Sequence, residues 1–298
     1  MGQTSNKQTI GFIGTGVMGK SMAGHLMAGG HPVLVYTRTK EKAADLLEKG
    51  AIWKDTVAEL AAEADVVITM IGYPKDVEEV YLGEGGIFAH AKPGTYAIDM
   101  TTSSPILARR IYEAAQEKGI HVLDAPVSGG DVGAQNARLS IMVGGNKEDF
   151  DAMVPIFEKM GTNIVYQGKA GAGQHTKMCN QIAIASGMIG VCEAMIYAKN
   201  AGLDQRTVLK SIETGAAGSF SLSNLAPRMI DGNFDPGFYV KHFIKDMGIA
   251  LESAKEMGLW TPGLELTKKL YEELAAKGEE NSGTHALYKL LDTQKHAE

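Results

Sequence analysis

The sequence predicts an α/β domain with a doubly wound, mostly parallel sheet, followed by an all-α domain that a long helix joins to it. In the first half, short β-branched runs alternate with helical patterns, and these strand patterns stop after Tyr166. A glycine-rich segment and one long apolar helical pattern then follow. With 298 residues the chain has the length of about two domains. We place the domains at residues 1–168 and 169–298.

In the first domain the strands and helices are expected to alternate strictly. The expected strands are Thr9–Ile13, Pro32–Tyr36, Val66–Met70, Thr95–Asp99, His121–Leu123, Leu139–Val143 and Asn163–Tyr166. The expected helices lie near residues 18–29, 40–49, 56–62, 76–82, 105–118 and 147–160. Ser104-Pro105 and Asn146 are suitable helix starts. Strict alternation of this kind is typical of a parallel sheet covered by helices on both faces.

The second domain begins after a glycine-rich hinge, Gly168–Gly173. We expect one helix over residues 174–201, ended by Gly202, and then only helices and loops. The expected breaks are Gly215–Gly218, Asp231–Gly237 and Gly278–Gly283. The uncharged run at the centre of the long helix has 11 residues, whereas a bilayer needs about 20. This predicts a buried helix and no membrane span.

Composition narrows the partners and the compartment. There are 29 Lys and Arg against 35 Asp and Glu, a net charge of −6, so no nucleic-acid partner is expected. The two cysteines, Cys179 and Cys192, would lie about 20 Å apart on the long helix, too far for a disulfide. The start of the chain lacks a signal-peptide pattern. These features predict a cytoplasmic protein.

Glycine, at 36 of 298 residues, is more abundant than in an average protein.

The first glycine cluster, Gly14-Thr15-Gly16-Val17-Met18-Gly19, follows a strand and opens a helix. In a Rossmann dinucleotide site these three glycines allow a tight turn, close approach of a pyrophosphate and helix packing on the strand. Together with Lys20-Ser21 the same stretch also matches a P-loop, and a glycine turn without a ligand is the third alternative. A P-loop would fold the bulky Val17 and Met18 into an anion cradle. A Rossmann turn places them in the first helical turn facing the sheet, which favours the Rossmann interpretation.

The second expected strand ends in Thr37-Arg38-Thr39. An NAD site would carry an acidic residue here to accept hydrogen bonds from the ribose 2′-hydroxyl. Two hydroxyls and a guanidinium suit a 2′-phosphate instead, so we expect NADP(H) to be favoured over NAD(H). The alternative is that Arg38 is a solvated loop charge paired with Glu41.

Two more loops carry candidate site residues. Ser128, Gly129 and Gly130 offer a hydroxyl and two unhindered N–H groups that can hold a carboxylate, although an irregular turn explains them equally well. Lys177 and Asn180 share one face of the long apolar helix. A lysine is costly to bury there without a task. The alternative is a lysine whose tip reaches water.

A last cluster contains Lys245 and Asp246 on an otherwise apolar helix. Lys245 is either a second cation for phosphate or nicotinamide, or an ion-pair partner of Asp246. Spacing alone leaves both open.

In this order and with these separations, the four clusters resemble the β-hydroxyacid dehydrogenase family, over about residues 8 to 290. This 6-phosphogluconate dehydrogenase-like family includes 3-hydroxyisobutyrate dehydrogenase, tartronate semialdehyde reductase and the glyoxylate/succinic semialdehyde reductases. The resemblance implies that Lys177 is catalytic with Asn180 beside it, and that Ser128, Gly129 and Gly130 bind the substrate carboxylate. It also implies the following cofactor contacts: Gly14, Thr15, Gly16, Val17, Met18, Gly19, Thr37, Arg38, Thr39, Met70, Ile71, Thr102 and Lys245. A homodimer or homotetramer is the usual assembly.

The chain departs from the family pattern at two places. Ile71-Gly72 stands where Leu-Pro is frequent, and Gln181 stands where a second Asn is frequent. Thr37, in place of an acidic residue, matches the NADP-using branch.

The expected function is therefore NADP-dependent hydride transfer between nicotinamide and a short 3-hydroxy acid or its semialdehyde. Reduction of glyoxylate, succinic semialdehyde or tartronate semialdehyde is the alternative, and an imine reductase or a non-catalytic cofactor-binding module is more remote. No metal is expected. A zinc enzyme would need ligands that two cysteines 13 residues apart on one helix cannot supply, and no His-Glu-x-x-His occurs.

Overall fold

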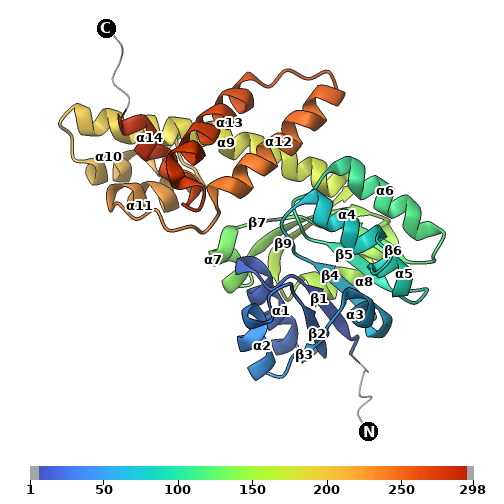
Figure 1. Ribbon diagram of the computed structural model, residues 1–298. Coiled ribbons are helices and arrows are strands. Elements are labelled where there is room, and N and C mark those ends of the chain that lie inside the picture. The colour runs from blue at the N-terminus through green and yellow to red at the C-terminus, as the bar shows by residue number, and fades with distance from the viewer. Residues whose placement is uncertain (1–6, 294–298) are drawn as a thin grey trace. The chain divides into compact units, whose positions relative to one another are not determined.

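A computed structural model describes residues 7–293 and divides them into two compact units. The first runs through Lys177 and the second starts at Met178. The first contains a sheet covered by helices, and the second is helical (Figure 1). The predicted fold class is confirmed.

The strands of the first unit form a single mixed sheet. They are β1 (Ile10–Ile13), β2 (Val33–Tyr36), β3 (Ile52–Trp53), β4 (Val66–Thr69), β5 (Tyr96–Asp99), β6 (His121–Asp124), β7 (Val127–Ser128), β8 (Leu139–Gly145) and β9 (Gly161–Gly168). Their order is β3-β2-β1-β4-β5-β6-β8-β7, with β9 paired to β8. The strand order therefore reverses between β1 and β4, where ligands bind in open α/β sheets.

The first six strands are parallel, as predicted, but β8 runs antiparallel to β6 and β7. The expectation of an uninterrupted strand–helix alternation is wrong at this point. Between β6 and β8 the chain forms only β7 and one short helix, α7 (Gly130–Gln135). A parallel crossover usually contains a full helix. Here the connecting residues 125–138 instead form β7, which pairs antiparallel with β8, and the short α7, so no crossover helix carries the chain back across the sheet.

Helices cover both faces of the sheet. One face packs against α1 (Val17–Ala28), α2 (Ala44–Glu48), α7 and α8 (Lys147–Phe157). The other packs against α3 (Val57–Glu63), α4 (Pro74–Leu82), α5 (Ile87–His90) and α6 (Pro105–Gln116). Side chains alternate between the two cores along each strand, so that Ile10 and Phe12 of β1 enter the first core and Ile13 the second.

Most differences from the predicted elements concern very short ones. Four elements were not predicted, because segments of two to six residues are too short to show a periodic pattern: β3, β7, α5 and α7. The helix expected over residues 40–49 is a 3₁₀ turn, Lys40–Ala43, followed by α2. Ser104 begins α6 as a true N-cap, accepting from the Leu107 N–H at 3.5 Å. Asn146 precedes α8, but its Oδ1 accepts from the Tyr112 hydroxyl instead.

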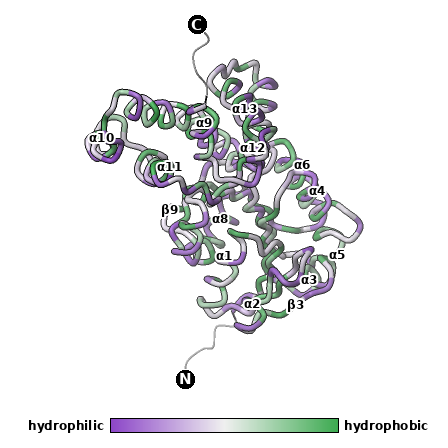
Figure 2. Tube along the Cα trace, turned by 60° about the vertical axis from the view of Figure 1, so that its left-hand side comes forward, coloured by the Kyte–Doolittle hydropathy of each residue, from purple (hydrophilic) through white to green (hydrophobic). Residues whose placement is uncertain are grey.

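The long helix α9 (Ala172–Asn200) begins in the first unit and continues through the second. It is joined there by α10 (Gln205–Ile212), α11 (Ala226–Ile230), α12 (Val240–Glu256), α13 (Pro262–Leu274) and α14 (Leu287–Thr293). The predicted breaks all fall between these helices. Hydrophilic and hydrophobic residues alternate along surface helices such as α13 (Figure 2).

By length and composition alone, α9 is the one helix within residues 7–293 that could cross a membrane. A core helix passes the same test, and one side of α9 does form the core of the second unit. Its buried residues there include Met188, Cys192 and Met195. Cys179 and Cys192 are both free thiols.

Candidate active site

The glycine loop between β1 and α1 is tight at two positions and open at the third. Gly14 has a φ of 99°, and a Cβ there would lie 2.3 Å from the Met70 carbonyl oxygen. A Cβ at Gly19 would lie 1.9 Å from the Gly14 carbonyl oxygen. At Gly16 a Cβ would meet nothing within 4 Å. This is the division of roles expected of a Rossmann turn: two glycines close the loop and the middle one leaves its backbone bare.

The surroundings of this loop fit the diphosphate of a dinucleotide. Gly16 is the N-cap of α1 and no side chain caps the helix, so its free N–H groups and positive end suit an anion. The Thr15 hydroxyl is buried and has no hydrogen-bond partner among the described residues. Met18 packs on the sheet as expected, but Val17 is 48% exposed, so its expected orientation is wrong. Its outward position leaves an apolar surface beside the bare backbone.

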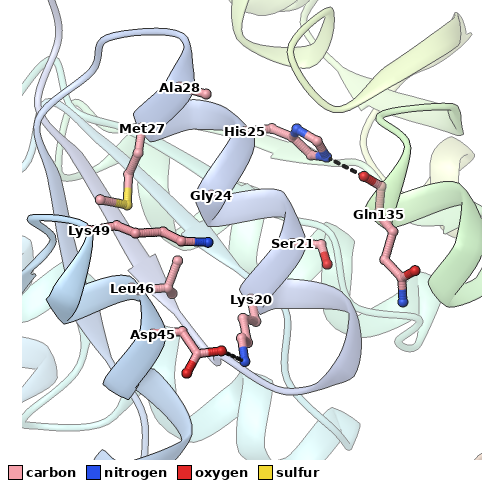
Figure 3. A pocket seen from close by; sticks show the side chains of 10 residues that line it. All are labelled: Lys20, Ser21, Gly24, His25, Met27, Ala28, Asp45, Leu46, Lys49 and Gln135. Carbon is pink, nitrogen blue, oxygen red and sulfur yellow. Dashed lines mark hydrogen bonds and ion pairs between the residues drawn. The ribbon is translucent and has the colours of Figure 1, made fainter.

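The P-loop interpretation is wrong. Its lysine would have to reach the phosphates, whereas the Lys20 amine is paired with Asp45 of α2 (Figure 3). Both residues line a 520 Å³ pocket beside α1 and α2, which extends to Gln135 of α7. None of the predicted site residues lines that pocket.

The end of β2 lies next to the glycine loop, because the Gly14 N–H donates to the Tyr36 carbonyl at 2.9 Å. Thr37 is half-buried there, and Arg38 and Thr39 are exposed. Arg38 Nη1 lies 3.6 Å from Asp76 Oδ1 at the start of α4. The guanidinium thus has an acidic neighbour, but it is Asp76 rather than the Glu41 considered from the sequence.

Three other predicted cofactor contacts lie at the carboxyl ends of β4 and β5. The Met70 N–H donates to the Ile13 carbonyl at 2.9 Å, and the Ile71 N–H donates to Thr101 Oγ1 at 3.0 Å. Thr102 follows Thr101 and is half-buried. The structure therefore brings these residues to the same sheet edge as the glycine loop, at the reversal of strand order.

Ser128, Gly129 and Gly130 join β7 to α7. Ser128 stands opposite Ser140 of β8 in the sheet register. Gly129 and Gly130 have φ values of 131° and 65°. All three residues are half-buried, so none of them is sealed in the core.

Lys177 lies in the second turn of α9 and is only 7% exposed. It is therefore not a surface lysine with its amine in open solvent. Asn180, one turn further along, belongs to the second unit and is half-buried.

The second unit links Asn180 to the other predicted cation through buried side chains. Asn180 Nδ2 donates to Gln181 Oε1 at 2.7 Å, and Gln181 Nε2 donates to Asp246 Oδ2 at 2.6 Å. Lys245 Nζ then lies 2.8 Å from Asp246 Oδ1. The ion pair considered from the sequence is therefore present. The role of Asp246 as the connecting residue was not predicted, although its position next to Lys245 was a usable signal.

Asp124, at the end of β6, was also missed. Its buried carboxylate accepts from the N–H groups of Gly171 and Gln174, at 2.8 and 2.9 Å, and so caps the start of α9. Burial raises the pKa of this carboxyl from 3.8 to about 7; the two N–H bonds lower it in part, and the nearby Asp99 carboxyl raises it. A single Asp at the end of a strand gives no sequence signal for capping a helix 48 residues further along the chain.

The raised pKa of Asp124 predicts a pH dependence of stability. The folded state keeps the proton more tightly than the unfolded state, so this stabilisation is complete below pH 3.8 and is lost as pH rises through about 7. Between pH 4.5 and 7.5, the unfolding free energy of the wild type should fall relative to Asp124→Asn by on the order of 3 kcal/mol. Urea unfolding at several pH values measures this. Asp151→Asn, at an exposed site on α8, is the control, and a constant difference between wild type and Asp124→Asn would contradict the assignment.

Within residues 7–293 no group of three or more His, Cys, Asp and Glu is arranged to hold a metal ion. The doubly wound sheet and the bare glycine loop at its switch point define a dinucleotide-binding protein.

Comparison with known proteins identifies the class more closely. Residues 9–168 match the NAD binding domain of 6-phosphogluconate dehydrogenase. Residues 171–291 match the domain described as NAD-binding of NADP-dependent 3-hydroxyisobutyrate dehydrogenase.

Individual proteins agree with the family matches. The chain is 71% identical to the uncharacterized oxidoreductase YkwC of Bacillus subtilis, over 95% of this chain and 99% of that protein. It is 47% identical to a probable mitochondrial 3-hydroxyisobutyrate dehydrogenase-like protein of Arabidopsis thaliana, over 97% of this chain and 86% of that one. A solved structure of Mycobacterium tuberculosis 3-hydroxyisobutyrate dehydrogenase with L-serine is 31% identical, with a TM-score of 0.87 and coverage of 96% and 99%.

The chain belongs to the β-hydroxyacid dehydrogenase family and is an NAD(P)-dependent oxidoreductase of that class. The family and the nicotinamide cofactor predicted from the sequence are confirmed.

Proposed function

We propose that the chain uses NADP(H) to interconvert a short 3-hydroxy acid and its semialdehyde, with Lys177 as the proton-transferring residue. The observation that carries this proposal is a lysine held 93% out of solvent on α9, in the same unit as the bare glycine loop. Burying an ammonium group is costly, which favours a functional role for this lysine. The mycobacterial relative with L-serine supports the substrate class, because serine is itself a 3-hydroxy acid.

Ser128 and the N–H groups of Gly129 and Gly130 hold the substrate carboxylate in this proposal. Anchoring the carboxylate orients the carbon that reacts, and such positioning can contribute several kcal/mol to catalysis. Because Ser128 is half-buried, it can contact a ligand without a rearrangement of the sheet. Asn180 orients the substrate oxygen beside Lys177.

NADPH, when bound, supplies the hydride that a carbonyl carbon accepts. Lys177 donates a proton to the carbonyl oxygen during reduction, and the neutral amine removes it from the hydroxyl during oxidation. The balanced reaction converts an aldehyde, NADPH and one proton into an alcohol and NADP⁺. Gly14–Gly19 would hold the diphosphate, and Met70, Ile71, Thr102 and Lys245 would lie near the nicotinamide end.

The preference for NADP(H) in this proposal depends on Thr37, Arg38 and Thr39. A guanidinium that contacts a 2′-phosphate forms a charge-assisted hydrogen bond of about 1.5–3 kcal/mol. We therefore expect Arg38→Ala to lower the ratio of kcat/KM for NADPH over NADH by about ten- to a hundredfold. Steady-state kinetics with both cofactors measure the ratio.

Arg110→Ala is the matched control, because Arg110 is also partly exposed and pairs with Glu78 of the same helix α4. This variant should keep the wild-type ratio. An unchanged ratio in Arg38→Ala would rule out a role for Arg38 in choosing the cofactor.

The substrate is tested by following NADPH consumption at 340 nm with a panel of aldehydes. The panel contains methylmalonate semialdehyde, the oxidised form of 3-hydroxyisobutyrate, with tartronate semialdehyde, succinic semialdehyde and glyoxylate. A cyclic imine serves as the comparison for imine reduction. Turnover of methylmalonate semialdehyde or tartronate semialdehyde supports the proposal, because each is reduced to a 3-hydroxy acid. Turnover of succinic semialdehyde or glyoxylate alone would give a 4-hydroxy or a 2-hydroxy acid and would favour the alternative substrates. Turnover of the imine alone would overturn the proposal.

The assembly and the compartment are part of the same proposal. A homodimer or homotetramer in the cytoplasm is expected. Large apolar side chains on the loop between α12 and α13 support self-association, since Trp260 is 76% exposed and Leu259 is 54% exposed. Size-exclusion chromatography with light scattering measures the assembly, and a monomer at micromolar concentration would contradict it.

A further inference from the structure

Buried hydrogen bonds tie the first turn of α9 to the ends of neighbouring strands. Gln174, in this turn, is fully buried. Its Nε2 donates to the Thr101 carbonyl at 2.7 Å, and its Oε1 accepts from the Ser103 N–H at 2.9 Å. Its own N–H donates to Asp124 at 2.9 Å. One residue of α9 is thus bonded both to the loop after β5 and to the end of β6.

The same turn lies directly on the backbone of the sheet. A Cβ at Gly173 would lie 2.4 Å from the Met142 carbonyl oxygen and 2.5 Å from that of Asp124. A Cβ at Gly144 would lie 2.7 Å from the Gly173 nitrogen. The two backbones are therefore packed so closely that only glycine fits at these two positions, and the hydrogen bonds of Gln174 and Asp124 hold the turn in this contact.

The hydrogen bonds continue to residues proposed to contact the cofactor. Thr101, which accepts from Gln174, also accepts from the Ile71 N–H through its hydroxyl at 3.0 Å. Thr102 stands between Thr101 and Ser103, the two partners of Gln174. Gln174 therefore fixes the segment that contains Thr102. Lys177 stands three residues after Gln174, on the same side of α9.

We propose that Gln174 and Asp124 are positioning residues for hydride transfer, which hold the Lys177 turn of α9 in register with the loops at the ends of β4 and β5. The inference rests on the proposed function and deepens it. Neither residue needs to touch the substrate. Both act through Lys177, because a general acid must lie within hydrogen-bond reach of the atom that it protonates. A misplacement of about 1 Å can cost on the order of a hundredfold in rate.

A double-mutant cycle between Gln174 and Lys177 tests the proposal. Gln174→Met keeps the length of the side chain and removes its two side-chain hydrogen bonds, to the Thr101 carbonyl and the Ser103 N–H. In the wild-type background we expect kcat, normalised to bound NADPH, to fall about 30- to 100-fold while the NADPH dissociation constant changes less than about threefold. In the Lys177→Ala background the same change should cost less than about threefold, because the residue through which it acts is already gone.

Thr176→Val is the matched control. Thr176 lies in the same turn, and its hydroxyl bonds Gln167 and the Ala172 carbonyl rather than the loop after β5. Its kcat should stay within about threefold of wild type. If Gln174→Met fails to fold, Asp124→Asn replaces it in the double-mutant cycle. This substitution changes the shape little and removes one of the two carboxylate oxygens that accept from the N–H groups of this turn.

The possible outcomes distinguish failure of the positioning role from failure of the proposed function. Equal losses in both backgrounds would show a purely structural role, and a loss below threefold in the wild-type background would show no role; either result overturns the inference. If Lys177→Ala alone keeps wild-type activity, or if the wild type reduces no semialdehyde, it is the proposed function that fails. Strong loss in the wild-type background with little loss in the Lys177→Ala background supports the positioning role.

Discussion

Lys177→Ala should lower kcat by about a thousandfold and leave NADPH binding within about threefold of wild type. Proton transfer by a positioned side chain contributes roughly 10²–10⁴-fold to a rate. Lys177 is buried and lies in the second turn of α9, whereas the glycine loop lies at the start of α1. The two functions of catalysis and cofactor binding are therefore carried by different segments. Stopped-flow reduction of a semialdehyde with a fluorescence titration of NADPH measures both.

Two further variants of Lys177 distinguish the loss of proton transfer from the loss of the positive charge and from the loss of side-chain packing. Lys177→Met keeps the apolar stem in place, so it should be as inactive as Lys177→Ala but more stable. Lys177→Arg keeps a positive charge that does not leave as a proton near neutral pH, and it should also be inactive. Lys199→Ala on the same helix, which removes a surface pair with Asp292, is the control. Lys177→Ala activity within tenfold of wild type would refute the assignment.

Gly19→Ala should have the second-largest effect, on cofactor affinity. Its Cβ would lie 1.9 Å from the Gly14 carbonyl oxygen and 3.0 Å from Phe12 Cε1. Because the nearer atom belongs to the backbone of the loop itself, the loop has to move away from α1. We expect the NADPH dissociation constant to rise at least about 30-fold. Crowding of this kind also costs about 1–3 kcal/mol of stability, which thermal unfolding detects.

Gly24→Ala is the matched control, one helical turn and a half further along α1. Its Cβ would meet only Leu46, at 3.9 Å, which is an ordinary contact. Alanine is favoured over glycine inside a helix by about 1 kcal/mol. This variant should therefore bind NADPH normally and be equally or more stable. Normal NADPH binding by Gly19→Ala would show that the loop does not hold the cofactor.

The elements with a clear period were predictable from the sequence. The seven predicted strands and the long helix of residues 174–201 all occur, because buried parallel strands form runs of apolar residues and helix ends carry residues such as Ser104 and Gly202. The missed β7 and α7 are too short for a period. The antiparallel course of β8 goes with a connection that contains β7 and no crossover helix, and neither β7 nor α7 could be predicted from the sequence pattern.

The candidate site was predictable where local motifs define it and not where the fold brings distant residues together. Gly14, Gly16 and Gly19 are spaced by one local turn, and the structure gives each its expected geometry. Gln174 and Asp124 are 50 residues apart and meet only because β6 ends beneath α9. The roles assigned to Lys177, Ser128 and the other site residues stay predictions until the variants are measured.

The most direct measurement follows the hydride itself. The enzyme is incubated with a semialdehyde acid and NADPH that carries deuterium on one or the other face of nicotinamide C4, and the hydroxy acid product is analysed by mass spectrometry. We predict that one of the two labelled cofactors gives a product with a single deuterium on the carbinol carbon, and that Lys177→Ala forms this product about a thousandfold more slowly. A hydroxy acid without deuterium from either cofactor, or no hydroxy acid at all, would contradict the account.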